Sequence, residues 1–492
     1  MLLRGKFHRG ESGILLHISS LPSRHGIGGL GIEAYQFVDF LRKGRQKLWQ
    51  ILPLVPVGEG NSPYKSPSCF AGEMLFIDLD FLVRDRLLES DELPPAQFPQ
   101  NVDYDAVREY KMPLLKLAAR RFNTRRADYI KFLKENESWI DDFAVFSAAA
   151  ECFGSESILD FPESIRLRMP AAMEDFCEDN AAVINFYKIT QFLFYEQYWA
   201  LKKYAEKNGV KIVGDIPFYV SLDSADVWKS PESFKLGRDM TPTLVAGVPP
   251  DMFSATGQLW GNPIYDWEHH RKTDYAWWKR RLAHCKKLYD IIRIDHFRAF
   301  ASYYTIIYGS PDAKSGTWEK GAGLHFWQSI RKKLGPMAIV AEDLGGDEPD
   351  VRKLVADTGF PNMKILQFAF DGDAANSHLP RNYEHNCVCY TGTHDNDTVL
   401  GWYSSVGNRE RAVAAQFFPD GNMPIPHKMI ALAMNSRADK VIVPMQDWLC
   451  LGSEARMNTP GTKTGNWQWR MPEDALTDDL AEKIRKISKG RN

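Results

Sequence analysis

The chain has 492 residues, of which 44% are hydrophobic and 25% charged, and its 61 basic and 63 acidic side chains give a net charge of −2. This balance, without a long basic run, argues against nucleic acid or an anionic membrane as the partner. No stretch approaches the ~20 consecutive apolar residues of a membrane span. Size alone would suggest two or three domains, but barrels with insertions reach this length as single units.

The N-terminus and the cysteines indicate the compartment. MLLRGKFHRGESG lacks the apolar core of a signal peptide, and the seven cysteines are scattered along the chain. Cys387 and Cys389 lie two apart in an apolar run, which is neither a zinc spacing nor a redox pair. We therefore expect a cytoplasmic protein with reduced thiols. The sequence gives no indication of the oligomeric state.

Eight short apolar or β-branched runs follow one another along the chain. Continuous apolar runs of this length are typical of parallel strands that are buried on both faces. In chain order the runs are Gly13–His17, Leu48–Pro53, Lys211–Pro217, Asp290–Asp295, Ala338–Asp343, Lys364–Phe368, Val388–Asp395 and Val441–Asp447.

Amphipathic helical patterns lie between several of these runs. Ala34–Arg45 and Val183–Lys207 are the clearest, and the second is followed by Gly209. Eight strands with intervening helices predict an α/β fold of the (β/α)₈ TIM-barrel class, formed as one catalytic unit over residues 1–492.

Two gaps between the runs are too long for one crossover helix. We therefore expect an insertion at about 56–205, between strands 2 and 3, and another at about 217–285, between strands 3 and 4, that carries an active-site lid loop. Barrels place such insertions at the C-terminal face. After the eighth run about 45 residues remain, enough for a terminal helix but not for a separate C-terminal β-domain.

Carboxylates at the ends of four runs are candidates for a shared site: Asp215, Asp295, Glu342 with Asp343, and Asp395 with Asp397. The C-terminal ends of barrel strands converge on one mouth, where clustered carboxylates raise the pKa of at least one of them. An acid with a raised pKa beside an ionised carboxylate suits glycoside cleavage. Any single strand-end acid is better explained as a helix cap or an ion-pair partner, but the joint pattern favours a catalytic site.

Basic side chains accompany these acids. Arg293 stands two residues before Asp295, so both side chains leave the same face of the strand, where a guanidinium would hold Asp295 ionised and oriented. His394, and less strongly His296, could donate hydrogen bonds to sugar hydroxyls. Asp and His at strand ends could also bind a metal, but no HxH or HExxH spacing is present, so we expect no metal and no organic cofactor.

At these residues the chain resembles the amylomaltase, or disproportionating enzyme, family, which is glycoside hydrolase family 77 and a relative of the α-amylases. The resemblance extends from about residue 13 to 471. The segment around 85–180 matches nothing residue by residue, and Ala299 stands where the family often has glycine. The strings that carry the resemblance are SLP (Ser20–Pro22), WQILPL (Trp49–Leu54), NSPYKS (Asn61–Ser66), GDIPFYVSLDSADVW (Gly214–Trp228), VAGVPPDMFSATGQLWGNPIYDW (Val245–Trp267), RIDHFR (Arg293–Arg298), AEDLG (Ala341–Gly345), MKILQFAF (Met363–Phe370), TGTHDND (Thr391–Asp397) and GNWQWR (Gly465–Arg470).

The resemblance implies a role for each matched position. Asp295 would be the nucleophile, Glu342 the general acid/base, and Asp395 would bind hydroxyls of the sugar being cleaved and favour its distorted form. The residues implied in substrate binding are Ser62, Tyr64, Asp215, Trp260, Arg293, His394 and Asn466.

These roles predict a 4-α-glucanotransferase. It would move segments of an α-1,4-glucan donor to the 4-hydroxyl of glucose or a maltooligosaccharide through a glycosyl-aspartate, with retention and with the two carboxyls ~5–5.5 Å apart. Acceptor subsites and a lid would let a sugar outcompete water. The segments Phe253–Trp260 and Gly465–Trp469 offer aromatic and glycine residues for such subsites.

Three other functions fit parts of the pattern. An α-amylase-type hydrolase would use the same carboxylates, but it typically carries a β-domain after the barrel. A catalytically silent glucan-binding protein would have lost a catalytic residue, whereas Asp295, Glu342 and Asp395 are all present. A metal-dependent barrel hydrolase would be inactivated by chelators.

Overall fold

A computed structural model describes residues 10–250, 254–345 and 348–491. Eight parallel strands close into a barrel in the order β1, β2, β3, β6, β9, β10, β11, β12. Each strand falls within or overlaps one of the eight predicted apolar runs, so the predicted TIM-barrel class is confirmed. The strands are β1 Glu11–Leu15, β2 Leu48–Gln50, β3 Lys211–Ile216, β6 Ile291–Ile294, β9 Ile339–Ala341, β10 Asn362–Ile365, β11 Cys387–Tyr390 and β12 Lys440–Pro444.

Closure of the barrel joins the first strand to the last. β1 pairs in parallel with β12 on one side, from Glu11↔Lys440 to Leu15↔Pro444, and with β2 on the other. At the start of β1 the Glu11 carboxylate bridges Lys211 of β3 and Lys440 of β12. One acidic side chain therefore ties three strands together at the N-terminal end of the barrel.

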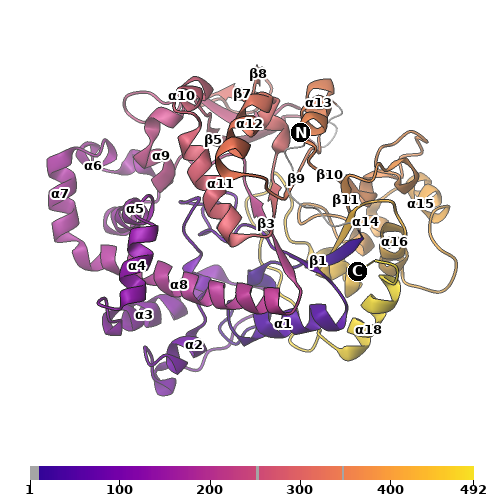
Figure 1. The fold of residues 1–492 in the computed structure, drawn as a ribbon, viewed down its shortest axis with the longest axis horizontal. Coiled ribbons are helices and arrows are strands. Elements are labelled where there is room, and N and C mark those ends of the chain that lie inside the picture. Colours follow the sequence, from indigo (N-terminus) through magenta and orange to yellow (C-terminus); the bar gives the residue numbers. More distant parts are fainter. Residues whose placement is uncertain (1–9, 251–253, 346–347, 492) are drawn as a thin grey trace.

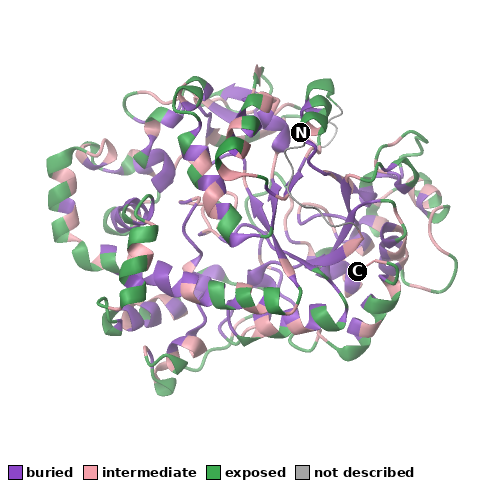
Figure 2. Ribbon diagram, viewed as in Figure 1, coloured by how far each residue is buried: buried purple, intermediate pink, exposed green. Residues whose placement is uncertain are grey.

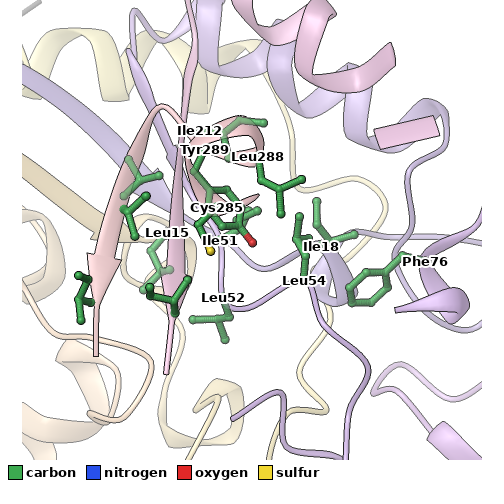
Figure 3. Packing of buried hydrophobic residues seen from close by; sticks show 14 of the residues in the cluster. Leu15, Ile18, Ile51, Leu52, Leu54, Phe76, Ile212, Cys285, Leu288 and Tyr289 are labelled. Carbon is green, nitrogen blue, oxygen red and sulfur yellow. The ribbon is translucent and has the colours of Figure 1, made fainter. Parts of the chain in front are cut away.

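The barrel strands are almost entirely buried (Figure 2). Side chains from β1, from the segment after β2, from β3 and from the end of α11 meet in one apolar cluster (Figure 3). Among them are Leu15, Ile51, Ile212 and Leu288, each no more than 6% exposed. Burial on both faces explains why these strands read as continuous apolar runs.

Helices surround the barrel, and the segment between β2 and β3 forms a helical lobe, α2 to α8, at the left of Figure 1. The predicted helices correspond to α1 and α8, and Gly209 follows α8 with φ 72°. None of the helices in the described part of the chain is long and apolar enough to cross a membrane. The helices are α1 Ile32–Lys43, α2 Leu79–Arg84, α3 Tyr104–Arg121, α4 Ala127–Glu135, α5 Ile140–Phe153, α6 Glu163–Arg166, α7 Pro170–Asp179, α8 Ala181–Lys207, α9 Ala225–Lys229, α10 Trp267–Lys272, α11 Ala276–Leu288, α12 Gly323–Leu334, α13 Pro349–Thr358, α14 Val399–Ser405, α15 Asn408–Ala415, α16 Ile425–Met434, α17 Met445–Trp448 and α18 Asp478–Ile487.

A second sheet of four antiparallel strands, which the sequence pattern did not predict, has the order β5-β4-β7-β8. Its first two strands lie between β3 and β6, and its last two follow β6, so the sheet joins segments from both sides of a barrel strand. The strands are β4 Leu244–Val248, β5 Gln258–Pro263, β7 Ser302–Ile307 and β8 Thr317–Lys320. We propose that the segments at about 56–205 and 217–285 are insertions into one barrel unit.

Candidate active site

A cleft of about 400 Å³ opens where the barrel strands end. Eight of the ten predicted site residues line it, and the other two, Asp215 and Arg293, lie beneath it. The lining residues are Glu59, Gly60, Ser62, Tyr64, Lys65, Pro217, Phe218, Tyr219, Gln258, Trp260, Asn262, Asp295, His296, Glu342, His394, Asp395, Asn458, Pro460, Gly461, Thr462, Lys463, Asn466 and Trp467.

The base of the cleft is formed by three connected side chains, Tyr64, Asp215 and Arg293, which we call the floor trio. Asp215 and Arg293 are paired in the register of β3 and β6, so their side chains lie next to each other. Arg293 Nη1 donates to both carboxylate oxygens of Asp215, at 2.7 and 2.6 Å, and the Tyr64 hydroxyl donates to Asp215 Oδ2 at 2.7 Å. With 0% and 3% exposure, Asp215 and Arg293 form a buried, hydrogen-bonded ion pair.

Asp295 follows directly after β6 and turns its carboxylate into the cleft. As the two-residue spacing predicted, Arg293 reaches it as well, with Nη2 3.0 Å from Asp295 Oδ1. Burial raises the pKa of Asp295 well above its usual range, Arg293 opposes this, and the charges of Asp215 and Glu342 add to it. A side-chain exposure of 27% leaves the carboxylate accessible from the cleft.

Glu342 follows β9, the neighbour of β6 in the barrel, and is 8% exposed. Its Oε2 accepts the backbone N–H of His296 at 2.7 Å and its Oε1 accepts that of Leu344 at 2.8 Å. His296 adopts the left-handed conformation, φ 48°, in the turn after Asp295. Burial raises the pKa of Glu342, although Arg293 and the two N–H groups oppose the shift.

Asp395 and its neighbour His394 lie in the loop after β11. His394 Nε2 is 3.4 Å from Asp395 Oδ2, and Asn458 Nδ2 donates to Asp395 Oδ1 at 2.6 Å. The imidazole stacks on Tyr64 with ring centroids 5.3 Å apart, and Trp467 flanks both rings. Burial lowers the pKa of His394, which keeps the ring neutral at pH 7.

The upper wall of the cleft comes from strand β5, which carries Trp260, and from the loops that carry Ser62 and Asn466. Trp260 meets the His296 ring edge to face at 4.8 Å, and its Nε1 donates to Gln258 at 3.1 Å. Ser62 Oγ accepts the N–H of Tyr64 at 3.2 Å. Asn466 Oδ1 accepts the N–H of Thr459 at 2.9 Å, so it also shapes its own loop. Phe253, in the predicted aromatic segment, lies outside the described residues.

Tyr219, Gln258 and Asn458 are among the lining side chains that the sequence did not predict as site residues. Tyr219 and Gln258 lie within the strings that carry the family resemblance, so closer attention to those strings could have found them. Asn458 lies between two such strings, and no local pattern marks it.

One group among the described residues has the composition of a metal site: His25, Asp78 and Asp80. None of the three lines the cleft. Asp80 pairs with Arg24, and Asp78 caps α2 by accepting the N–H of Phe81 at 2.9 Å. These acids therefore already have protein partners, and they are separate from the carboxylates at the barrel mouth.

Comparison with known proteins identifies the family. The sequence profile of the 4-alpha-glucanotransferases, glycoside hydrolase family 77, matches residues 16–477. The chain belongs to this family. The 4-alpha-glucanotransferase of Clostridium butyricum is 43% identical over 481 residues, which cover 96% of this chain and 99% of the relative. That of Streptococcus pneumoniae (strain TIGR4) is 44% identical over 480 residues, 96% of this chain and 95% of the relative.

A solved structure agrees with this assignment to the 4-alpha-glucanotransferases. The amylomaltase from Streptococcus agalactiae in complex with acarbose superposes with a TM-score of 0.95 at 39% identity, covering 98% of this chain and 99% of the other. The predicted family resemblance is thus confirmed, and the chain is an enzyme of the glycosyltransferase type.

Proposed function

We propose that this 4-alpha-glucanotransferase transfers segments of α-1,4-glucan to the 4-hydroxyl of glucose or a maltooligosaccharide, by a retaining double displacement. The observation that carries the proposal is the pair Asp295 and Glu342, which face one cleft from the neighbouring strands β6 and β9, with Arg293 in contact with Asp295. Two carboxyls that flank one cleft are the groups a retaining glycosidase mechanism requires.

The first half of the reaction breaks the glycosidic bond. Asp295 Oδ attacks the anomeric carbon while Glu342 gives its proton to the departing 4-oxygen, which leaves a β-linked glycosyl-aspartate and a shortened glucan. The second half reverses these roles. Glu342, now ionised, takes the proton from the 4-hydroxyl of an acceptor, whose oxygen attacks the anomeric carbon and displaces Asp295, so the α-linkage is rebuilt.

The surroundings of the two carboxyls favour this division of roles. Burial raises the pKa of both carboxyls, and more strongly that of Asp295. Arg293, 3.0 Å from Asp295, favours the negative charge there. Glu342 is 8% exposed, and its burial favours the protonated form, whereas the N–H groups of His296 and Leu344 favour the ionised form. The proposed mechanism requires the proton on Glu342, and the contact of Arg293 with Asp295 is the feature that supports this division of roles.

The floor trio supports the sugar at the cleavage point indirectly. Asp215 and Arg293 are too deeply buried to line the cleft, so we propose that they fix Tyr64 and Asp295. The Tyr64 ring, stacked on His394, presents an apolar surface to a sugar ring. Asp395 and His394 offer an acceptor and a donor to its hydroxyls.

Transfer requires that a sugar outcompete water in the second half. We propose that Trp260 and the loop around Asn466 form part of the acceptor subsites, because both line the cleft above the carboxyls. An acceptor held in a fixed orientation reacts faster because the entropy cost of its attack is lower, whereas unbound water has no such rate advantage. Closure over the acceptor would exclude water from the glycosyl-enzyme.

The test uses purified protein with maltotriose, with and without a metal chelator. We expect glucose and a ladder of longer maltodextrins, with no net gain of reducing ends and no effect of the chelator. Asp295→Asn should lose at least about 10⁴-fold in rate, because the nucleophile acts as one unit with its acid. Asp290→Asn is the matched control, since Asp290 precedes β6 at the other end of the barrel and does not line the cleft.

A steady rise in reducing ends without a ladder would show a hydrolase and overturn transfer. Full activity in Asp295→Asn would overturn the assignment of the nucleophile. Inactivation by the chelator would favour a metal-dependent hydrolase.

A further inference from the structure

The loop that carries His394 and Asp395 is fixed at its base by one buried acid. Asp447, just after β12 and 1% exposed, accepts the Thr391 hydroxyl at 2.6 Å and the N–H of Val399 at 2.7 Å. These two residues lie on either side of the loop. Asp447 therefore fixes where the loop begins and ends, but it makes no contact with the Asp395 carboxylate.

A second segment, Arg456–Asn458, contacts the top of the same loop through three hydrogen bonds. Arg456 Nη2 donates to the backbone oxygen of Asp395 at 2.7 Å. The N–H of Asn458 donates to the backbone oxygen of His394 at 3.0 Å. The Asn458 amide donates to Asp395 Oδ1 at 2.6 Å. The main chain and the carboxylate of Asp395 are thus held from one side.

Arg456 also holds Asn458 itself. Its Nε donates to the backbone oxygen of Asn458 at 2.8 Å while Nη2 holds Asp395. A guanidinium offers such donors in a fixed planar fork, so the distance between the two backbone oxygens is set by its geometry. Lysine, a single point charge on a flexible stem, could not reproduce this arrangement.

We propose that Arg456 and Asn458 are a positioning pair that sets the direction of the Asp395 carboxylate. The proposal rests on the proposed function, in which Asp395 acts on the distorted sugar. The Asp395 side chain is 39% exposed and follows no strand directly, so without the pair its carboxylate would keep only the 3.4 Å contact with His394 Nε2. The Asn458 amide fixes one carboxylate oxygen without neutralising the charge and leaves the other for a sugar hydroxyl.

The decisive variant is Asn458→Asp, because the aspartate side chain has nearly the same shape as that of asparagine but carries a carboxylate in place of the amide. Two carboxylates at this distance share a proton at low pH, and the shared proton replaces the amide hydrogen bond. Above the upper pKa of the pair both are ionised and repel each other. We therefore expect kcat on maltotriose to fall about tenfold per pH unit in that range, with KM changed less than about threefold.

Two further variants and a control complete the test. Asn458→Ala and Arg456→Lys should lower kcat by about 10- to 100-fold at every pH, because a carboxylate displaced by ~1 Å costs about 100-fold. Asn376→Asp is the matched control: Asn376 Nδ2 donates to Asp371 at 2.9 Å, outside the cleft. Its pH profile should match that of the unaltered enzyme. Thermal melting of each variant separates misfolding from misplacement.

A pH profile of Asn458→Asp that superposes on that of the unaltered enzyme would overturn the positioning pair. So would Arg456→Lys with full kcat, which covers the case in which Asn458→Asp does not fold. In both cases the unaltered enzyme still produces a ladder from maltotriose, so the proposed function would stand. If the unaltered enzyme gives no ladder, the proposed function itself has failed.

Discussion

The two sides of the cleft are built differently. Asp215, Arg293, Asp295 and Glu342 stand on or directly after the strands β3, β6 and β9, whose pairing register fixes their neighbours. Asp395 stands on a loop, and its carboxylate depends on side chains that come from a second loop. Tyr64 and its stacking partner His394 join the two sides.

The strand-borne residues contribute mainly to the stability of the fold, whereas the loop-borne residues contribute mainly to recognition of the sugar. The strand-borne side buries an ion pair whose charges satisfy each other, so removing one charge destabilises the fold. The loop-borne side keeps its carboxylate partly exposed, so it can exchange water for sugar hydroxyls at little cost. Substitutions on the two sides should therefore fail in different ways.

The largest expected effect tests this contrast directly. Asp215→Asn should lower the free energy of unfolding by about 3–5 kcal/mol, because it leaves the buried Arg293 with Asp295 as its one remaining charge partner. Asp395→Asn, at an exposed position, should change it by less than about 1 kcal/mol while activity is lost. Urea unfolding of both variants measures the difference. Equal losses of stability would refute the contrast.

The next prediction concerns the pH dependence of the strand-borne side. Cleavage needs a proton on Glu342, and burial raises its pKa above the usual 4.5. The kcat/KM for maltotriose should therefore fall at high pH, about tenfold per unit above the raised pKa. The fall should disappear in Glu342→Gln assayed with α-maltotriosyl fluoride, whose leaving group needs no proton. Persistence of the same fall in that variant would assign it to another group.

The smallest expected effect belongs to the wall of the cleft that strand β5 forms. Trp260→Ala removes a ring that packs edge to face against His296, and such contacts contribute about 0.5–1.5 kcal/mol. We expect the ratio of transfer to hydrolysis to fall about 3- to 10-fold, with the unfolding midpoint nearly unchanged. Glucose release and net reducing ends, followed in one reaction, give that ratio. An unchanged ratio would remove Trp260 from the acceptor side.

The sequence predicted the strand-borne side well, because burial on both faces leaves a continuous apolar run that ends at a carboxylate. All eight barrel strands overlap a predicted apolar run, and Asp215, Asp295 and Glu342 stand at the ends of three of these runs. The proximity of Arg293 to Asp295 follows from strand alternation alone. Tyr64 and Trp260 were identified as site residues from the family resemblance, since an isolated aromatic side chain carries no local signal of a binding role.

The second sheet and the positioning pair had no comparable signal. β8 is largely exposed and lacks the pattern of a buried strand. β4 has three buried residues, but it is short and contains Gly247, a residue that is depleted in strands. The partners β4 and β7 are separated along the chain by the barrel strand β6. Arg456 and Asn458 reach Asp395 across more than 60 positions, a contact that exists once the barrel is closed.

The pairing of β1 with β12 has a consequence for how the protein is made. Ribosomes add about 5–20 residues per second, so β1 emerges roughly 20–90 s before Lys440 and the rest of its partner strand. During that time one edge of β1 has no strand beside it, and an unpaired apolar edge is a template for wrong pairing. The nascent chain is therefore an open sheet for most of its synthesis, and we expect its dependence on chaperones to end when β12 is released.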